Sequence, residues 1–286
     1  MRQMFDHSQA FTRNIGWLTE AELAALSTRR IAIAGLGGVG GSHLLTLCRL
    51  GIGGFHIADF DRFELVNFNR QAGASMSHLG RPKVEVMAEM ALDINPTLAL
   101  SRFAEGINEG NLDTFLSGMD IYIDGLDFFA MEAREQVFAA CAAKGIPAIT
   151  AAPLGWGVSL LTFLPGAMSF EDYFQMAGCS PAERLGRFMV GLSPEALQLG
   201  ALVDPTRLDL ARQAGPSTPV GCEFCAAMAA VTAVKLLLGR GTVEAAPTSI
   251  HIDGFSMRMA TLSRPLGMRE PAMQAALARL AGAHRT

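Results

Sequence analysis

Hydrophobic and polar positions in the first half of the chain form repeating units, each a short apolar run followed by an amphipathic stretch. Short apolar runs bounded by turn residues indicate buried strands, and apolar residues at helical spacing indicate helices. The expected strands lie at 31–34, 55–59, 98–103, 120–124 and 147–151, with helices at 40–50, 83–94, 111–116 and 131–144 between them. A further helix at 20–26 opens with Thr19 and Glu22 in a capping-box pattern. Strands separated by such helices predict a parallel sheet with right-handed crossovers.

The second half of the chain has a different pattern. A strand at 156–165 is followed by a long segment, 166–219, that is rich in glycine and proline and weakly periodic. A nearly apolar helix at 222–238, which we expect to be buried, precedes a strand at 248–253 and a terminal helix at 271–281. His251 alternates with Ile250 and Ile252, which predicts an outward-facing histidine.

These elements together predict an α/β fold of the Rossmann-like kind. We expect a mostly parallel sheet with helices on both faces, an antiparallel C-terminal extension of that sheet and a long crossover segment. The chain divides into an N-terminal helical arm, a nucleotide-binding core, a crossover or substrate segment, and a C-terminal helix-strand-helix part of the same domain. The respective boundaries are 1–29, 30–165, 166–218 and 219–286.

Glycines gather between the first strand and its helix. Glycine allows a tight turn and a close approach of backbone to ligand, and the N–H groups at the helix start favour anionic phosphate. Asp59 ends the second strand, where its two oxygens can accept both ribose hydroxyls, and Asp61 is either a second contact or a turn residue. The predicted nucleotide contacts are Gly35, Gly37, Gly38, Gly40, Asp59 and Asp61.

The connector after the second strand carries side chains that suit a polyphosphate. Cleavage of a nucleoside triphosphate between its α- and β-phosphates needs cations and usually Mg²⁺. No Walker sequence occurs in the chain, so Arg70 and Lys83 are the candidate cations, with Asn67 and Gln71 as neutral donors. Asp127 follows the strand at 120–124, and its place at a carboxyl end makes it a candidate Mg²⁺ ligand.

Composition narrows the class of protein. Half of the 286 residues are hydrophobic and 17% are charged, which is typical of a globular chain. The net charge of −4 and the absence of basic runs argue against nucleic-acid binding. Prolines interrupt the uncharged stretch 145–170, so we expect paired strands there and no membrane span. The polar start lacks a secretory signal, and five cysteines, an odd number, favour a reducing cytoplasm.

Several motifs in a fixed order resemble the ThiF/MoeB family of adenylyltransferases, whose fold is shared with the ubiquitin-activating enzymes. The resemblance covers roughly residues 11–165, with a weaker echo at 220–238. It is carried by Arg13-Asn14, Gly35-x-Gly37-Gly38-x-Gly40, Asp59-Phe60-Asp61, Asn67-x-x-Arg70-Gln71, Gly80-x-Pro82-Lys83, Asn95-Pro96 and Asp124-x-x-Asp127.

The resemblance implies an activity and a role for each matched residue. Such proteins bind ATP and Mg²⁺ and adenylate a carboxylate, typically the C-terminus of a small ubiquitin-like protein, with release of pyrophosphate. By this resemblance Asp59 holds the ribose, Asp127 carries Mg²⁺, and Arg13 is an arginine finger that reaches into the partner subunit of a homodimer. The implied phosphate contacts are Asn67, Arg70, Gln71 and Lys83. A ubiquitin-like protein, a sulfur-carrier protein, a peptide or a small free acid would all fit as substrate.

The cysteines depart from the family pattern. Many relatives bind zinc through two C-x-x-C pairs, whereas this chain has Cys222-x-x-Cys225 and, apart from that pair, Cys179 as a third candidate. Three thiolates are one short of the usual tetrahedral set, so we expect no zinc. Some relatives form a thioester or persulfide in the crossover segment, and whether Cys179 does so is left open.

Two other classes of function stay open at this point. An NAD-dependent oxidoreductase would use the same glycine turn, although the sequence offers no clear acid or base for hydride transfer. A nucleotide-binding subunit that has lost catalysis and serves a partner would keep the fold. The segment that should select the substrate, 166–217, contains no motif that identifies it.

Overall fold

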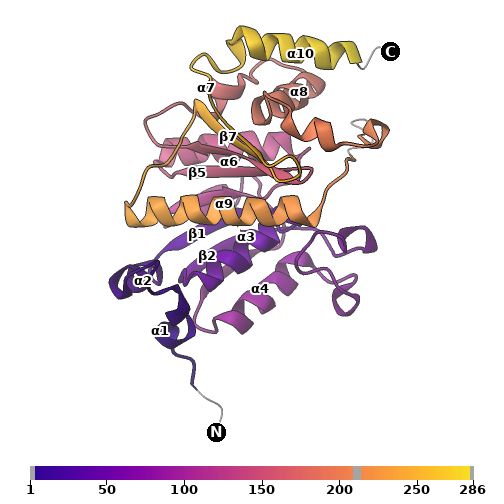
Figure 1. Ribbon diagram of the computed structural model, residues 1–286. Coiled ribbons are helices and arrows are strands. Elements are labelled where there is room, and N and C mark those ends of the chain that lie inside the picture. The colour runs from indigo at the N-terminus through magenta and orange to yellow at the C-terminus, as the bar shows by residue number, and fades with distance from the viewer. Residues whose placement is uncertain (1–3, 209–213, 284–286) are drawn as a thin grey trace. The chain divides into compact units, whose positions relative to one another are not determined.

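The computed structural model describes residues 4–208 and 214–283 (Figure 1). Its contacts divide the chain into two compact units. The first comprises Met1–Leu126 and Ala226–Val243, and the second comprises Asp127–Cys225 and Glu244–Thr286.

The first unit is built on four parallel strands in the order β3-β2-β1-β4. In this register Ile33 of β1 lies between Ile57 of β2 and Ile123 of β4. β1, β2 and β4 are largely buried on both faces, which explains their mostly apolar sequences, whereas the edge strand β3 is largely exposed. The strands are β1 (Arg30–Ala34), β2 (Gly54–Ala58), β3 (Ala99–Phe103) and β4 (Ile121–Asp124).

Helices connect these strands and begin where the sequence places start signals. α2 opens with the predicted capping box, in which Thr19 accepts from the Glu22 N–H and Glu22 accepts from the Thr19 N–H. α3 and α4 lie side by side in the first unit (Figure 1). The bounds are α1 (His7–Ala10), α2 (Glu20–Leu26), α3 (Gly38–Arg49), α4 (Lys83–Ile94) and α5 (Leu112–Leu116).

The second unit pairs its strands antiparallel in the order β5-β6-β7-β8. Its core is aromatic, with the rings of Phe163, Phe170, Phe174 and Phe188 in successive contact. The strands are β5 (Ala148–Leu154), β6 (Gly157–Phe163), β7 (Thr248–Asp253) and β8 (Arg258–Ser263). The helices are α6 (Met131–Lys144), α7 (Phe170–Phe174), α8 (Pro181–Leu192) and α10 (Pro271–Ala283).

The predicted fold class is confirmed, since parallel strands alternate with helices in the first unit and antiparallel strands follow in the second. α9 (Pro219–Leu238) is less buried than its composition predicts, because Val231 is 52% exposed. Among residues 4–208 and 214–283, α9 is also the one helix long and apolar enough to cross a membrane. The core helices of soluble proteins meet the same criteria of length and composition. β8 was not predicted, and α7 and α8 occupy the segment that reads as weakly periodic.

His251 was predicted to face outward, and this prediction is wrong. The side chain is 1% exposed, on the face of β7 that also carries buried Ser249 and Asp253. Both ring nitrogens lack a hydrogen-bond partner among the described residues. The alternation with isoleucine was read correctly, but the polar face is covered within the second unit. Ser159 of β6, the residue paired with His251, donates a hydrogen bond to the Leu192 carbonyl of α8.

Two buried histidines should make folding sensitive to acid. Burial lowers the pKa of His43, in α3, to about 3 and also lowers the pKa of His251. The unfolded chain therefore binds these protons more readily, and stability present above the unfolded value of about 6.5 is lost as the pH falls through it. We expect His43 to contribute a loss of about 1 kcal/mol between about pH 8 and pH 5.5, and His251 to add a loss in the same direction. Urea unfolding at both values checks this, and the loss should shrink in His251→Leu; an unchanged pH dependence in that variant would contradict the assignment to His251.

Candidate active site

The turn after β1 is formed by backbones that approach too closely for side chains. Gly35 has a φ of +83°, and a Cβ built there would lie 2.1 Å from the Gly125 carbonyl oxygen at the end of β4. A Cβ on Gly40 would lie 1.8 Å from the Gly35 carbonyl oxygen. The glycines at 35 and 40 are therefore required by the packing of this turn against β4.

Helix α3 begins at this turn. Gly37 is its N-cap residue and provides no side chain to cap the first N–H groups. Such groups need a partner and carry the positive end of the helix dipole. Gly37 and Gly38 are half-buried while Gly40 is buried, so the first turn of the helix reaches the surface. The arrangement suits an anionic group.

Asp59 forms a direct hydrogen bond with the glycine turn. Its carboxylate accepts a hydrogen bond from the Leu36 N–H at 2.7 Å and another from the Asp61 N–H at 2.8 Å. Burial raises the pKa of Asp59, while these two N–H donors and the nearby Lys83 lower it and offset part of that effect. Each carboxylate oxygen has a second lone pair, so accepting from ribose hydroxyls is compatible with this geometry.

Lys83 is held against the same segment. Its ammonium donates to the Asp61 carboxylate at 2.9 Å, and its backbone N–H donates to the Asp61 carbonyl at 2.9 Å. The lysine side chain is 7% exposed and the aspartate side chain 54% exposed. This difference leaves a largely desolvated cation, whose interaction with an anion would be stronger than in water.

The connector residues differ in how closely they approach the turn. Gln71 is buried, and its Nε2 lies 3.6 Å from the position of a Cβ on Gly37. Its Oε1 is buried without a hydrogen-bond partner among the described residues. Buried Asn67 accepts from the Glu64 N–H at 2.9 Å. Arg70 donates to the Val66 carbonyl at 3.0 Å and so is directed along its own connector.

Arg13 lies away from the glycine turn of its own chain. It is exposed on a 3-10 turn (Thr12–Asn14), where Asn14 donates to the Arg49 carbonyl at 3.0 Å. Arg49 is the last residue of α3, whereas the glycine turn precedes the first. A helix of this length separates the two by about 17 Å.

Asp127 is the first residue of the second unit. The residue is exposed, and its Oδ1 accepts from the Phe129 N–H at 2.9 Å. Among residues 4–208 and 214–283 no three His, Cys, Asp or Glu side chains gather as a metal site. A single carboxylate fits Mg²⁺, which protein sites typically bind through one or two carboxylates together with substrate phosphates.

The cysteines considered for zinc differ in their burial. Cys222 and Cys225 are buried in α9, and burial raises the pKa of Cys225 well above its usual value. Cys179 is half-buried and lies 3.7 Å from the Gln175 carbonyl oxygen, to which its thiol donates.

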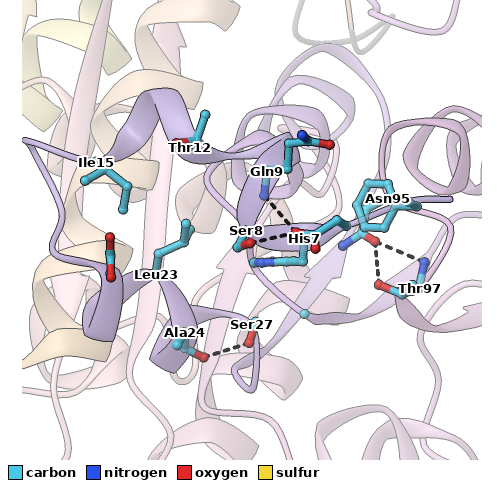
Figure 2. A pocket seen from close by; sticks show the side chains of 14 residues that line it. His7, Ser8, Gln9, Thr12, Ile15, Leu23, Ala24, Ser27, Asn95 and Thr97 are labelled. Carbon is cyan, nitrogen blue, oxygen red and sulfur yellow. Dashed lines mark hydrogen bonds between the residues drawn. The ribbon is translucent and has the colours of Figure 1, made fainter. Parts of the chain in front are cut away.

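A cavity of about 860 Å³ lies elsewhere in the first unit. Figure 2 shows His7, Ser8 and Gln9 of α1 facing it together with residues of α2 and with Asn95 and Thr97. Gly53 and Thr97, which precede β2 and β3, place it at the amino ends of the strands. The glycine turn follows the carboxyl end of β1, so this cavity is not the candidate nucleotide site.

Comparison with known proteins identifies the family. The family model described as "ThiF family" matches residues 11–272, and the chain belongs to this family. It is 31% identical over 136 residues to the sulfur carrier protein ThiS adenylyltransferase of Escherichia coli, which covers 48% of this chain and 53% of that protein. It is 30% identical over 141 residues to a tRNA threonylcarbamoyladenosine dehydratase of Bacillus subtilis, covering 49% and 55% of the two chains. The chain spans about half the length of these curated relatives.

Solved structures share the fold. Escherichia coli MccB with ATP has a TM-score of 0.65 at 19% identity, covering 92% of this chain and 72% of that one. PaaA has a TM-score of 0.66 at 19% identity, covering 92% and 77%.

Alanine substitutions at two neighbouring glycines of α3 should distinguish the effect of turn packing on stability from the effect of helix propensity. Gly40→Ala forces a Cβ against the Gly35 carbonyl, and we expect a loss of about 1–3 kcal/mol in unfolding free energy. Gly41→Ala is the matched control, because its nearest contacts would lie at 3.4 Å and alanine favours a helix. Urea unfolding measures both; equal effects of the two substitutions would contradict this account of the turn.

Proposed function

We propose that this protein is an ATP-dependent adenylyltransferase that activates a carboxylate and releases pyrophosphate. Membership of the ThiF family and one structural observation support the proposal. That observation is the joining of the glycine turn, Asp59, Asp61 and buried Lys83 by direct hydrogen bonds. In the proposed reaction a carboxylate oxygen attacks the α-phosphorus of ATP, the bond from that phosphorus to the α–β bridging oxygen breaks, and an acyl adenylate forms.

The proposed role of each residue follows from its charge and hydrogen-bonding groups. The turn glycines 35, 37, 38 and 40 approach the nucleotide, and Asp59 accepts from the ribose. Lys83 contributes a desolvated ammonium to the phosphates. Asp61 accepts from one of its three N–H groups, which leaves two to donate to phosphate oxygens. Asn67, Arg70 and Gln71 add donors, Gln71 through its Nε2 near Gly37. When bound through Asp127, Mg²⁺ would neutralise charge on the phosphates.

Attack of one anion on another makes alignment and charge neutralisation the main catalytic requirements. Arg13 is proposed to supply charge to the site of a second copy in a homodimer. Its place at the far end of α3 from its own glycine turn supports a role in a partner rather than in its own site.

The proposed substrate is the C-terminal carboxylate of a small ubiquitin-like or sulfur-carrier protein, or of a peptide, in the cytoplasm. The ThiS adenylyltransferase among the relatives supports this class. Other relatives are dehydratases named for a modified nucleoside of tRNA. A carboxylate carried on RNA is therefore the second candidate substrate. The net charge of −4 favours the protein or peptide acid.

Isotope exchange between pyrophosphate and ATP tests the reaction. With Mg²⁺ and a candidate carboxylate, we expect exchange by the wild type and a loss of at least about 100-fold in Lys83→Ala, since a single preorganised charge commonly contributes that much. Arg81→Ala is the matched control, because Arg81 lies on the same connector and forms a pair with Glu89. Exchange by Lys83→Ala at the wild-type rate would overturn the role of Lys83, and wild type without exchange would favour the inactive partner subunit.

Nucleotide choice separates the adenylyltransferase from an NAD-dependent oxidoreductase. A ligand that binds the folded state raises its apparent stability, by about 2.7 kcal/mol at 100 times its dissociation constant. We expect ATP with Mg²⁺ to raise the melting temperature and NAD to leave it unchanged, and thermal unfolding with each nucleotide measures this. Protection by NAD alone would overturn the proposal in favour of the oxidoreductase.

A further inference from the structure

Arg134, in α6, is a buried cation that the activity proposed above does not use. The residue is 2% exposed and is the largest of the fully buried side chains among the described residues. Removing a guanidinium from water is costly unless hydrogen bonds replace its hydration. Its position therefore indicates specific partners rather than a solvated helix face.

Two hydrogen-bond partners of Arg134 are carbonyls of the turn that carries Asp127, and its Nη1 also lies 3.5 Å from the Met131 Sδ. Nη2 donates to the Asp127 carbonyl at 2.9 Å, and Nη1 donates to the Phe128 carbonyl at 3.3 Å. The Asp127 carbonyl also accepts from the Ala130 N–H at 3.0 Å, while the Asp127 carboxylate accepts from the Phe129 N–H. A single planar group thus holds two successive carbonyls of a four-residue turn, and the Phe129 N–H of the same turn holds the Asp127 carboxylate.

A ring from the crossover segment holds the guanidinium from another side. The guanidinium carbon of Arg134 lies 4.5 Å from the centre of the Phe188 ring on α8, a cation–π contact. Phe188 also contacts Phe128, with ring centres 5.3 Å apart. Arg184, one turn earlier on α8, pairs with Glu135 at 3.3 Å. These contacts lie within the second unit and make the Asp127 turn, α6 and α8 one packed group.

We propose that Arg134 is a positioning residue that presents the Asp127 carboxylate to Mg²⁺. The inference rests on the proposed function, in which Asp127 is the metal ligand. Outer partners of a ligand often set metal affinity by 10- to 100-fold, because they fix its orientation. A lysine has a single nitrogen on a flexible stem, so it cannot bond both carbonyls in a fixed plane while stacking on Phe188.

Manganese binding in place of Mg²⁺ tests this without relying on turnover. The probe is the paramagnetic signal of Mn²⁺, titrated into protein saturated with an ATP analogue whose α–β bridge is a methylene group. We expect Arg134→Met, which keeps much of the buried volume, to weaken Mn²⁺ binding about tenfold or more. Arg134→Lys should not restore it, and analogue binding measured in EDTA should stay within about twofold of wild type.

Two controls separate positioning from general damage. Arg184→Met removes a neighbouring arginine that does not bond the Asp127 turn, so its Mn²⁺ affinity should match wild type. In Asp127→Asn, adding Arg134→Met should cause little further loss, because the two residues act through one ligand. If Arg134→Met does not fold, Phe188→Leu removes the supporting ring and should weaken Mn²⁺ binding in the same direction.

Unchanged Mn²⁺ affinity in Arg134→Met, or an equal loss of analogue binding in EDTA, would overturn the positioning role. Additive losses in the double variant would overturn it as well. A wild type whose Mn²⁺ affinity depends on both Asp127 and Arg134, but which shows no pyrophosphate exchange, would retain this inference while the proposed reaction fails.

Discussion

The hydrogen bond from the Leu36 N–H to the Asp59 carboxylate is the interaction on which the candidate active site depends. It joins the end of β2 to the glycine turn after β1, two segments that no covalent connection holds at this distance. The contact requires a buried carboxylate, whose desolvation two backbone donors and the nearby Lys83 partly offset. Asp61 then continues the network to the buried ammonium of Lys83 at the start of α4.

Much of the fold was predictable because β1, β2 and β4 are mostly apolar runs and several helices carry their own start or stop signals. α4 and α6 have the bounds that the pattern predicts, with Pro82 before Lys83 and Gly145 after Lys144. The missed elements have physical reasons. α7 has five residues and cannot show a helical period, while β8 has alternating but mostly exposed positions. His251 shows that alternation identifies two faces of a strand but not which one is covered.

The arrangement of the candidate site was predictable where motif and topology agree. Glycines, Asp59 and Lys83 come from consecutive strand and helix boundaries, and parallel strands bring their carboxyl ends to one edge. Arg134 was not predicted, because an arginine among alanine and glutamate in a helix is typical of a solvated face. The cavity of Figure 2 was also missed, since Asn95 and the residues of α1 share no pattern. The roles of Arg13 and Asp127 stay predictions, since they concern a second subunit and a metal ion.

The interlocked glycines at 35, 40 and 125 have a consequence for how this protein can change over time. A Cβ at any of them would overlap with main-chain atoms contributed by another of the three. The spacing between the ends of β1 and β4 is therefore set by bare peptide groups, with no side chain whose size could be adjusted gradually. Substitutions that alter what the site binds are consequently tolerated in the surrounding loops and not at these three glycines.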